Sequence, residues 1–274
     1  MEEILHTLND PRLIAALEAN LEEEMMSFGR VLSGAEIYND GQIEGFFTGR
    51  GHLNGILRTH LTHLDAEIIQ GRINAVLAYF RAKQVAKIGW SVGQDCQPAN
   101  LAVYLEQEGF RRLSEENIGL ALDSATMRVE EEHVEGLEIR ELVNIEDLSV
   151  LYKMEMEGFG SSEEMAGYYC EMYKNAGFGP GTNWRHFGGW WQGEIVAATS
   201  LLFHAGVAGI YGVATVPQAR RHGIARSMVL RAIAAAHQQD YRIVILSPTD
   251  MSAGIYHRLG FREYTRIRHY RREL

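Results

Sequence analysis

Residues 211–236 combine a strand pattern, a short basic loop and a helix pattern in an order suited to binding an anion. The β-prone run from Tyr211 to Val216 is followed by Pro217, and the helix pattern begins near Gly223. The first amides of a helix have no internal partners and lie at the positive end of the helix dipole. Gly223 would let the backbone approach a ligand closely. The chemistry indicated is phosphate recognition by backbone amides.

Two motifs in this part of the chain resemble signatures of the GNAT acetyltransferase superfamily. The spacing of Arg220, Gly223 and Ala225 is similar to the family's phosphate-loop signature, and the segment from Ser252 to Phe261 is similar to its last helix. The alternative is an ordinary α/β loop with a buried tyrosine beyond it. The resemblance implies that the loop amides hold the pyrophosphate of acetyl-CoA. The implied acetyl-CoA contacts are Val213, Ala214, Thr215, Val216, Arg220, Arg221, His222, Gly223, Ile224, Ala225, Arg226, Ser252 and Tyr256.

Tyr256 is the candidate catalytic residue. A phenol with a pKa near 10 stays protonated at pH 7 and can donate its proton to a departing CoA thiolate. Backbone N–H groups from Val213 to Val216 would polarise the thioester carbonyl. The identity of the general base is left open, because residues 209–216 contain neither an acidic residue nor a histidine. Three other residues could act as the base through a water molecule: Tyr211, His204 and Glu194. Alternatively, the amine arrives already neutral and needs no base.

These features predict an acetyl-CoA-dependent N-acetyltransferase that acts on an amine of a small molecule or peptide by direct attack on the thioester. The alternative is a catalytically inactive acyl-CoA-binding regulatory protein. A third hypothesis gives the first domain a partner that the second domain acetylates. Acetyl-CoA is the expected co-substrate, no metal is expected, and a homodimer is left open.

Composition and charge narrow the class of protein. The 274 residues and the 46% hydrophobic content suit two modest domains. Cys96 and Cys170 form no C-x-x-C pair, so neither a disulfide framework nor a zinc site is indicated, and Cys170 is expected to be a structural thiol. Without a signal sequence or a long apolar run, we expect a soluble cytoplasmic protein with no membrane partner.

The charge of the chain is unevenly distributed. The net charge of −10 argues against nucleic acid as a partner. Residues 217–274, however, hold 11 Lys+Arg against 4 Asp+Glu, and this basic block contains the predicted phosphate loop. Such an asymmetry would steer an anion towards the loop. The acidic balance of residues 124–216 slightly favours a cationic acceptor.

An internal repeat is predicted from the two ends of the expected domains. Gly109-Phe110 corresponds to Gly260-Phe261 at an offset of 151 residues, and Leu105 takes the position of Tyr256. Coincidence is the alternative, because glycine commonly ends a helix. The resemblance implies an α/β class (an α+β mixed sheet) with tandem GNAT-like folds, each a mostly antiparallel central sheet flanked by helices. We place a degenerate GNAT-like domain at residues 1–123 and the acetyl-CoA-binding catalytic domain at 124–274, with the boundary near Ser124.

The remaining elements follow from hydrophobic periodicity and turn residues. Helices are expected after Asp10, over residues 61–82, after Asn144 and after Ser161. The core candidates of the second of these helices are Leu64, Ile68, Ile69, Ile73, Val76, Leu77 and Phe80. Strands are expected within 38–55 and over 137–143, 184–191, 195–203, 241–246 and 261–274, with a hairpin turn at Gly193. Trp190 and Trp191 should face opposite sides of a sheet as core residues, and the loop 175–183 is expected to line a substrate entrance.

Overall fold

The computed structural model describes residues 3–51, 53–127, 134–179, 181–249 and 251–274. The chain divides into two compact units. The first comprises Met1–Leu21 and Leu120–Glu263, and the second comprises Glu22–Gly119 and Tyr264–Leu274. The predicted boundary near Ser124 lies close to the change of unit at Leu120. Each end of the chain, in contrast, belongs to the unit that is formed mainly by the other half of the sequence.

The sheet of the first unit runs in the order β5-β10-β9-β8-β7-β6. Its pairs are antiparallel except for β9 and β10, which are parallel. All four residues of β10 are buried, which confirms the central strand predicted near residues 241–246. The strands are β5 (Arg111–Asp123, of which Leu120–Asp123 pair with β10), β6 (Leu137–Leu142), β7 (Trp184–Trp191), β8 (Glu194–His204), β9 (Val207–Thr215) and β10 (Ile243–Leu246).

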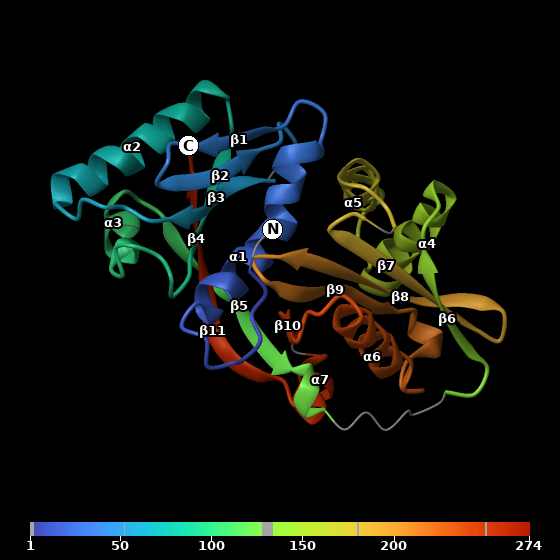
Figure 1. The fold of residues 1–274 in the computed structure, drawn as a ribbon. Helices are drawn as coiled ribbons and strands as arrows, with labels where there is room; N and C mark the ends of the chain where they lie inside the picture. The colour runs from blue at the N-terminus through green and yellow to red at the C-terminus, as the bar shows by residue number, and fades with distance from the viewer. Residues whose placement is uncertain (1–2, 52, 128–133, 180, 250) are drawn as a thin grey trace. The chain divides into compact units, whose positions relative to one another are not determined.

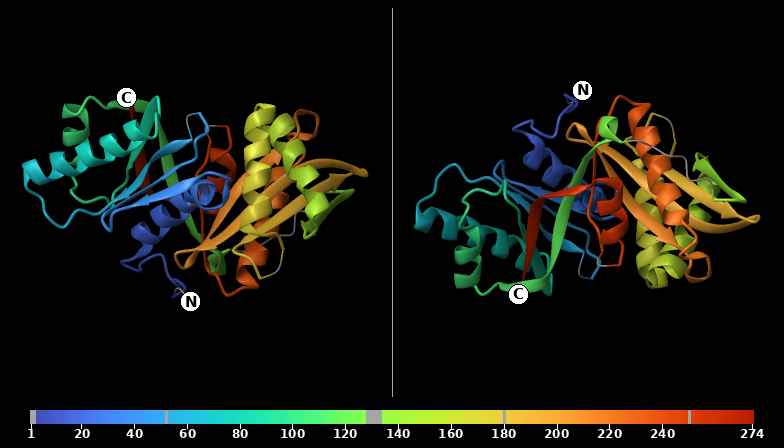
Figure 2. Two further views of the ribbon diagram at one scale, coloured as in Figure 1. Left: turned by 90° about the horizontal axis from the view of Figure 1, so that it is seen from above. Right: turned by 90° about the horizontal axis from the view of Figure 1, so that it is seen from below.

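Helices cover both faces of this sheet (Figures 1 and 2). On one face lies α6 (Ile224–His237), whose Arg231 guanidinium sits 4.6 Å from the ring of Phe187 on β7. The neighbouring His186 points to the opposite face, where it contacts Tyr173. The elements on that face are α4 (Leu148–Lys153), the π-helix η3 (Met154–Phe159) and α5 (Glu163–Ala176). Short 3₁₀ turns lie at η1 (Ser124–Thr126), η2 (Ile145–Asp147) and η4 (Pro217–Ala219).

Within the second unit, the strands run in the order β1-β2-β3-β4-β11, and the unit has its own hydrophobic core. The strands are β1 (Glu36–Asn39), β2 (Ile43–Phe47), β3 (Asn54–Thr59), β4 (Lys87–Val92) and β11 (Arg262–Glu273). Its helices are α2 (Ala66–Ala82) and α3 (Leu101–Gln107). The helix α1 (Leu13–Val31) begins in the residues assigned to the first unit and ends in those of the second.

Helix α2 buries only part of the core that the sequence predicted for it. Its apolar face is buried as expected at Ile69, Ile73, Val76, Leu77 and Phe80. Leu64 and Ile68, however, are 54% and 43% exposed, so their assignment to the core was wrong. The reason is the helix start: Leu64 precedes Asp65, the N-cap residue, and therefore lies outside the helical periodicity. Ile68 is turned about 100° around the helix from Ile69, to the side away from Ile73 and Leu77, and so lies outside the buried face.

The two predicted repeat ends have the same local geometry. Gly109 follows α3 with φ 83°, and Gly260 follows α7 (Ala253–Leu259) with φ 98°. The amide of Phe110 donates to the carbonyl of Leu105 at 2.9 Å, and the amide of Phe261 donates to that of Tyr256 at 3.1 Å. This left-handed helix stop requires glycine, which explains why the sequence repeats there. Both phenylalanines are buried.

Candidate acetyl-transfer site

The central feature of the site is a strand edge that opens partway along β9. The parallel pairing of β9 with β10 consists of Ala208 with Val244 and Gly209 with Ile245. Strand β9 continues to Thr215, paired with β8 on its other side. Beyond Gly209, no β10 residue within the described ranges pairs with the free side of β9. An exposed row of backbone N–H and C=O groups is a template for an extended ligand that pairs like a strand.

A β-bulge distorts β9 within this open stretch. Ala198 pairs with Ala214 and Ser200 pairs with Tyr211, so Gly212 and Val213 together oppose the single residue Thr199. Gly212 has φ 57°, which a side chain would strain. The Thr199 hydroxyl donates to the carbonyl of Tyr211 at 3.2 Å. A bulge re-aims the backbone groups of its strand, and this one lies where the sequence predicted a carbonyl-polarising amide.

The loop after β9 leads into an accessible helix start. Gly223 is the N-cap of α6 with φ 80°, Arg221 has φ 65°, and both are exposed together with His222. Ile224 is buried and anchors the first turn, while Ala225 and Arg226 are partly exposed. The backbone is therefore both fixed and open to solvent at this point. Such a helix start can accept a phosphate group.

Arg220 contacts the protein's own backbone. Its Nε atom donates to the Thr215 carbonyl at 3.0 Å, and an Nη atom donates to the Gly158 carbonyl at 2.9 Å. The guanidinium therefore ties the loop to β9 and to η3.

Val216 is buried, and its amide donates to the Val196 carbonyl at 2.9 Å. Of the four predicted carbonyl-polarising amides, this one is therefore already engaged.

Thr215 ends the open edge with an unsatisfied polar atom. Its hydroxyl oxygen is buried and has no hydrogen-bond partner within the described residues. A buried hydroxyl without a partner costs stability unless a ligand or water satisfies it. The neighbouring Ala214 is buried against η3, because a Cβ atom placed on Gly158 would lie only 2.8 Å from the Ala214 Cβ. The strand end is therefore packed on one side and chemically unsatisfied at its edge.

Tyr256 lies on α7 and is 5% exposed. Burial raises the pKa of its phenol, which a hydrogen bond with Ser252 partly opposes. The Ser252 hydroxyl also lies within 3.1 Å of Thr249 oxygens just before the helix. Tyr256 is therefore protonated at neutral pH, as a proton donor must be.

The general-base candidates from the sequence lie in unsuitable places. The Tyr211 hydroxyl is 2.7 Å from both the backbone oxygen and Oδ1 of Asn20, and Tyr211 is buried. Glu194 is exposed at the β7–β8 hairpin, and His204 ends β8 at the opposite end of that strand. The structure instead presents Glu155, a 9% exposed carboxyl on η3. No sequence pattern indicated this residue, because its burial depends on the packing of a π-helix.

A histidine that the sequence reasoning also missed lies on the η3 side of the sheet. His186 is fully buried, and its Nδ1 atom is 2.8 Å from the Ser200 hydroxyl. Its ring lies among those of Tyr173, Phe178 and Trp184, with centroid distances of 4.5 to 5.9 Å. Burial lowers the pKa of His186 to about 3, so the imidazole is neutral. The stacking of Phe178 on His186 places the predicted entrance loop beside this aromatic cluster.

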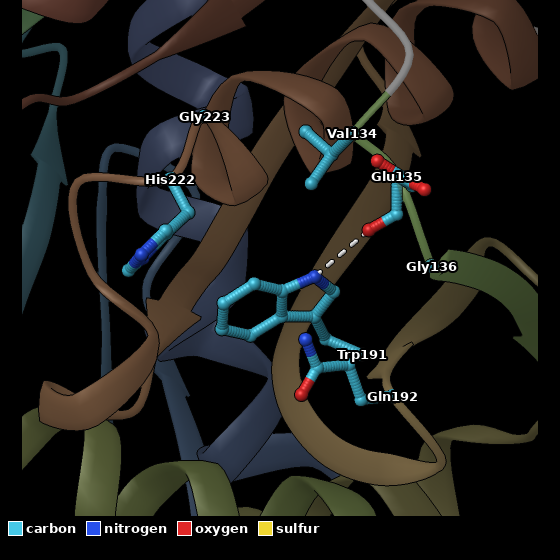
Figure 3. A pocket seen from close by; sticks show the side chains of 7 residues that line it. All are labelled: Val134, Glu135, Gly136, Trp191, Gln192, His222 and Gly223. Carbon is cyan, nitrogen blue, oxygen red and sulfur yellow. Dashed lines mark hydrogen bonds between the residues drawn. The ribbon is translucent and has the colours of Figure 1, made fainter.

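An open cavity of about 660 Å³ lies beside Gly223 (Figure 3). Trp191 and His222 line it with ring centroids 4.7 Å apart, and the Trp191 indole donates to the Glu135 carbonyl at 3.0 Å. The Arg140 guanidinium covers the neighbouring Trp190 at 3.8 Å. Both tryptophans are partly exposed, so their assignment to the core was wrong, although the hairpin and its turn at Gly193 are confirmed.

Comparison with known proteins identifies the arrangement. Residues 203–264, from the end of β8 to the start of β11, match the profile of the acetyltransferase (GNAT) domain family. Residues 203–264 are thus similar to a GNAT domain, and the fold of the chain is that of tandem GNAT structures. A comparison with curated protein sequences found no match.

Solved structures with the same fold cover nearly the whole chain. A GCN5-related N-acetyltransferase from Kribbella flavida is 16% identical, with a TM-score of 0.73 over 94% of this chain and 95% of that one. A tandem GNAT protein from the clavulanic acid biosynthesis pathway is 14% identical, with a TM-score of 0.67 over 97% and 96%. A GCN5-related N-acetyltransferase from Sphaerobacter thermophilus is 17% identical, with a TM-score of 0.66 over 87% and 76%. At these low sequence identities, the structural similarity establishes the fold alone.

The second GNAT-like unit has an equivalent parallel pair, but its edge is filled. Strands β3 and β4 pair at Gly55 with Gly89 and at Ile56 with Trp90. Beyond them, the Gln97 amide donates to the Thr59 carbonyl at 2.8 Å, and the Leu61 amide donates to the Gln97 carbonyl at 3.0 Å. A later segment of the chain thus occupies the edge of β3, whereas no described β10 residue pairs with β9 beyond Gly209. The start of α2 carries Asp65 and Glu67, which would repel an anion.

Two further properties bear on the expected partners. None of the helices in the described ranges combines the length and apolar character needed to cross a membrane. In that same part of the chain, no group of three or more His, Cys, Asp or Glu side chains is arranged to hold a metal ion.

Proposed function

We propose that the protein is an acetyl-CoA-dependent N-acetyltransferase that transfers an acetyl group to an amine of a small molecule or peptide. The observation that carries this proposal is the open, bulged edge of β9, which runs directly into the exposed Gly223 loop. An extended pantetheine arm can pair with such an edge while its pyrophosphate meets the helix start. The unsatisfied Thr215 hydroxyl lies between these two features and fits a polar ligand.

The chain's own residues supply two parts of acetyl transfer in this proposal. When bound, acetyl-CoA supplies an activated thioester carbonyl. Amides at or next to the Gly212–Val213 bulge polarise that carbonyl, and Tyr256 gives its proton to the sulfur as the C–S bond breaks. Arg220 acts as a positioning residue, since its bonds to Thr215 and Gly158 hold the loop against the strand. Arg221 and Arg226, in and just after the loop, attract the phosphates over distance.

One acetyl-CoA per chain is the expected stoichiometry, because the equivalent edge in the amino-terminal GNAT-like unit is occupied by Gln97. This supports the interpretation of that unit as a degenerate domain with no cofactor site of its own. Its role in partner binding stays a separate hypothesis.

A catalytically inactive acyl-CoA-binding regulator is the alternative. It is favoured by the absence of an acid or histidine from β9, whose described residues run from Val207 to Thr215. The two proposals share the acetyl-CoA site and differ in turnover.

The test combines calorimetry with a screen for CoA release. Acetyl-CoA should bind at a ratio of one per chain, and polyamines, amino acids, aminoglycosides and peptides with free N-termini serve as acceptors. Gly223→Glu should abolish binding while circular dichroism stays native, since it adds a side chain at φ 80° and a negative charge at the helix start. Normal binding by this variant would place the phosphate site elsewhere. Binding without any CoA release would favour the regulator.

A further inference from the structure

We propose that Glu155 is the general base that takes a proton from the acceptor ammonium group. This inference rests on the proposed function and supplies the group that the sequence of β9 lacks. Three observations carry it: the packing of η3 against the bulged strand, the burial of Glu155, and the fact that none of the described residues that interact with its carboxyl has a basic side chain.

The helix that carries Glu155 is held directly against the proposed reaction strand. Gly158 lies one helical turn beyond Glu155 and approaches Ala214 so closely that a Cβ atom at Gly158 would be 2.8 Å from the Ala214 Cβ. Arg220 clamps the same turn through the Gly158 carbonyl. The turn is a π-helix, a distortion that is frequent at functional sites. Strand β9, the loop that carries Arg220, and η3 are therefore held together in one fixed arrangement.

Among the described residues, the Glu155 carboxylate is hydrogen-bonded but forms no ion pair, so it can act as a base. Its Oε2 atom accepts a hydrogen bond from the Ser161 hydroxyl at 2.9 Å. Burial raises the pKa of the carboxyl, which this bond partly opposes. From α5, Cys170 faces it as a neutral thiol, whose pKa burial raises to about 11. Lys153 of α4 donates to the Ile195 carbonyl on β8, and Tyr211 of β9 is engaged with Asn20. A cationic substrate is the partner that such a carboxylate fits.

The protons in the proposed step balance with Glu155, Tyr256 and the acceptor amine alone. The Glu155 carboxylate removes one proton from the ammonium, and the neutral nitrogen forms a C–N bond with the thioester carbon. As the tetrahedral adduct collapses, the C–S bond breaks and the sulfur receives the proton of Tyr256. The second proton lost from nitrogen restores Tyr256, and the proton on Glu155 passes to solvent. The products are an amide, CoA and one released proton.

The test compares Glu155→Gln with the matched control Glu157→Gln, which changes an exposed glutamate on the same π-helix. Both variants are assayed with acetyl-CoA and the acceptor that releases CoA fastest among spermidine, lysine, kanamycin and a peptide with a free N-terminus. Glu155→Gln keeps the shape and the acceptor oxygen for Ser161. We expect it to lower kcat/KM about 10²- to 10⁴-fold at pH 7 and to leave the acetyl-CoA dissociation constant unchanged. The control should match the wild type.

The pH profile separates a base from a structural carboxyl. Without the base, the rate depends on amine that is already neutral, so the deficit of Glu155→Gln should shrink as the pH rises towards the amine pKa. A deficit that is constant with pH, or full activity at pH 7, would overturn the role of Glu155 alone. If Glu155→Gln does not fold, Glu155→Asp replaces it and must keep the wild-type profile at a lower rate. A wild type that binds acetyl-CoA but releases no CoA with any of these amines overturns the transfer reaction together with this role, whereas one that binds no acetyl-CoA overturns the proposed function itself.

Discussion

Tyr256 combines a buried ring with a hydroxyl that the proposed reaction uses. Its ring lies 6.0 Å from that of Phe261 in an edge-on contact, and the equivalent position of the other repeat, Leu105, is a purely apolar core residue. A leucine would suffice if the position only had to fill the space before Gly-Phe. The phenolic hydroxyl is therefore the part of the residue that a structural role alone does not require.

Replacing Tyr256 with Phe should separate these two roles. The ring is kept and one hydroxyl is lost, so acetyl-CoA affinity should change little while turnover falls about 10²- to 10⁴-fold. Steady-state kinetics and calorimetry on one preparation measure both quantities. If the hydroxyl only satisfies Ser252, the variant should instead lose about 1 to 3 kcal/mol of stability and keep the turnover of its folded fraction.

His186 should make the first unit sensitive to acid. Its pKa is about 3 in the folded chain and near 6.5 when unfolded, so between these values the unfolded state binds the extra proton. Stability is therefore fully present above about pH 6.5 and is lost as the pH falls, by about 1.4 kcal/mol per pH unit. His186→Phe keeps an aromatic ring and removes this term. Its free energy of unfolding relative to the wild type should rise between pH 6 and pH 4 in urea titrations, and a difference independent of pH would contradict the assignment.

Among the elements, η3 depends most on a single glycine. Gly158→Ala places a methyl group 2.8 Å from the Ala214 Cβ, so η3 or β9 must shift. We expect a loss of about 1 to 3 kcal/mol in stability. Turnover should fall more steeply, by up to about 10²-fold, because small displacements at a reacting centre are costly.

Gly167→Ala in α5 is the matched control for this change. A Cβ atom there meets nothing within 4 Å, so alanine should stabilise the helix by about 0.5 to 1 kcal/mol. Thermal melts and CoA-release assays on both variants test the comparison. Equal behaviour of the two alanine variants would show that η3 is not tightly packed on β9.

The sequence predicted those elements whose signals are local. The helix start at Gly223, the hairpin turn at Gly193 and the two glycine helix stops depend on backbone conformations that only a few residue types adopt. Leu64 and the two tryptophans were misplaced because apolar character alone does not reveal the side that a neighbour covers. Glu155 was not recognised because a π-helix shifts side chains away from the 3.6-residue period, and its burial arises from contacts between elements. The Arg220 clamp likewise needs Gly158, which is distant in sequence.

At the scale of the whole molecule, the sequence did not show that each chain end belongs to the unit formed mainly by the other half. Met1–Leu21 belongs with Leu120–Glu263, although the two segments are separated by the second unit. Leu5 donates to the Gly206 carbonyl at 2.9 Å, and Asn20 reaches the β8–β9 hairpin. A fragment that begins at residue 124 lacks these contacts and the Leu120–Asp123 strand end that pairs with β10. It is therefore an unsuitable test of an isolated catalytic domain.

Asn20 is the residue by which this dependence can be measured. It is fully buried, and its amide nitrogen lies 2.9 to 3.3 Å from the carbonyls of Leu202, His204 and Val207. Asn20→Ala would leave buried carbonyls without a donor and remove one oxygen beside the Tyr211 hydroxyl. Unsatisfied buried groups cost about 1 to 3 kcal/mol each, so we expect a loss of about 3 kcal/mol. For a unit of this size, that loss lowers Tm by about 6 to 12 °C.

The matched control is Asn74→Ala, whose amide makes only an exposed contact with Glu108 at 3.4 Å and should change Tm little. Acetyl-CoA binding reports on the unit concerned, because the proposed site lies entirely within it. Asn20→Ala should therefore lower the temperature at which acetyl-CoA binding is lost, by the same amount as Tm. If Tm falls while binding persists above the new transition, the amino-terminal segment stabilises the chain without supporting the acetyl-CoA site. An unchanged Tm would mean that the hydrogen bonds of Asn20 do not stabilise the first unit.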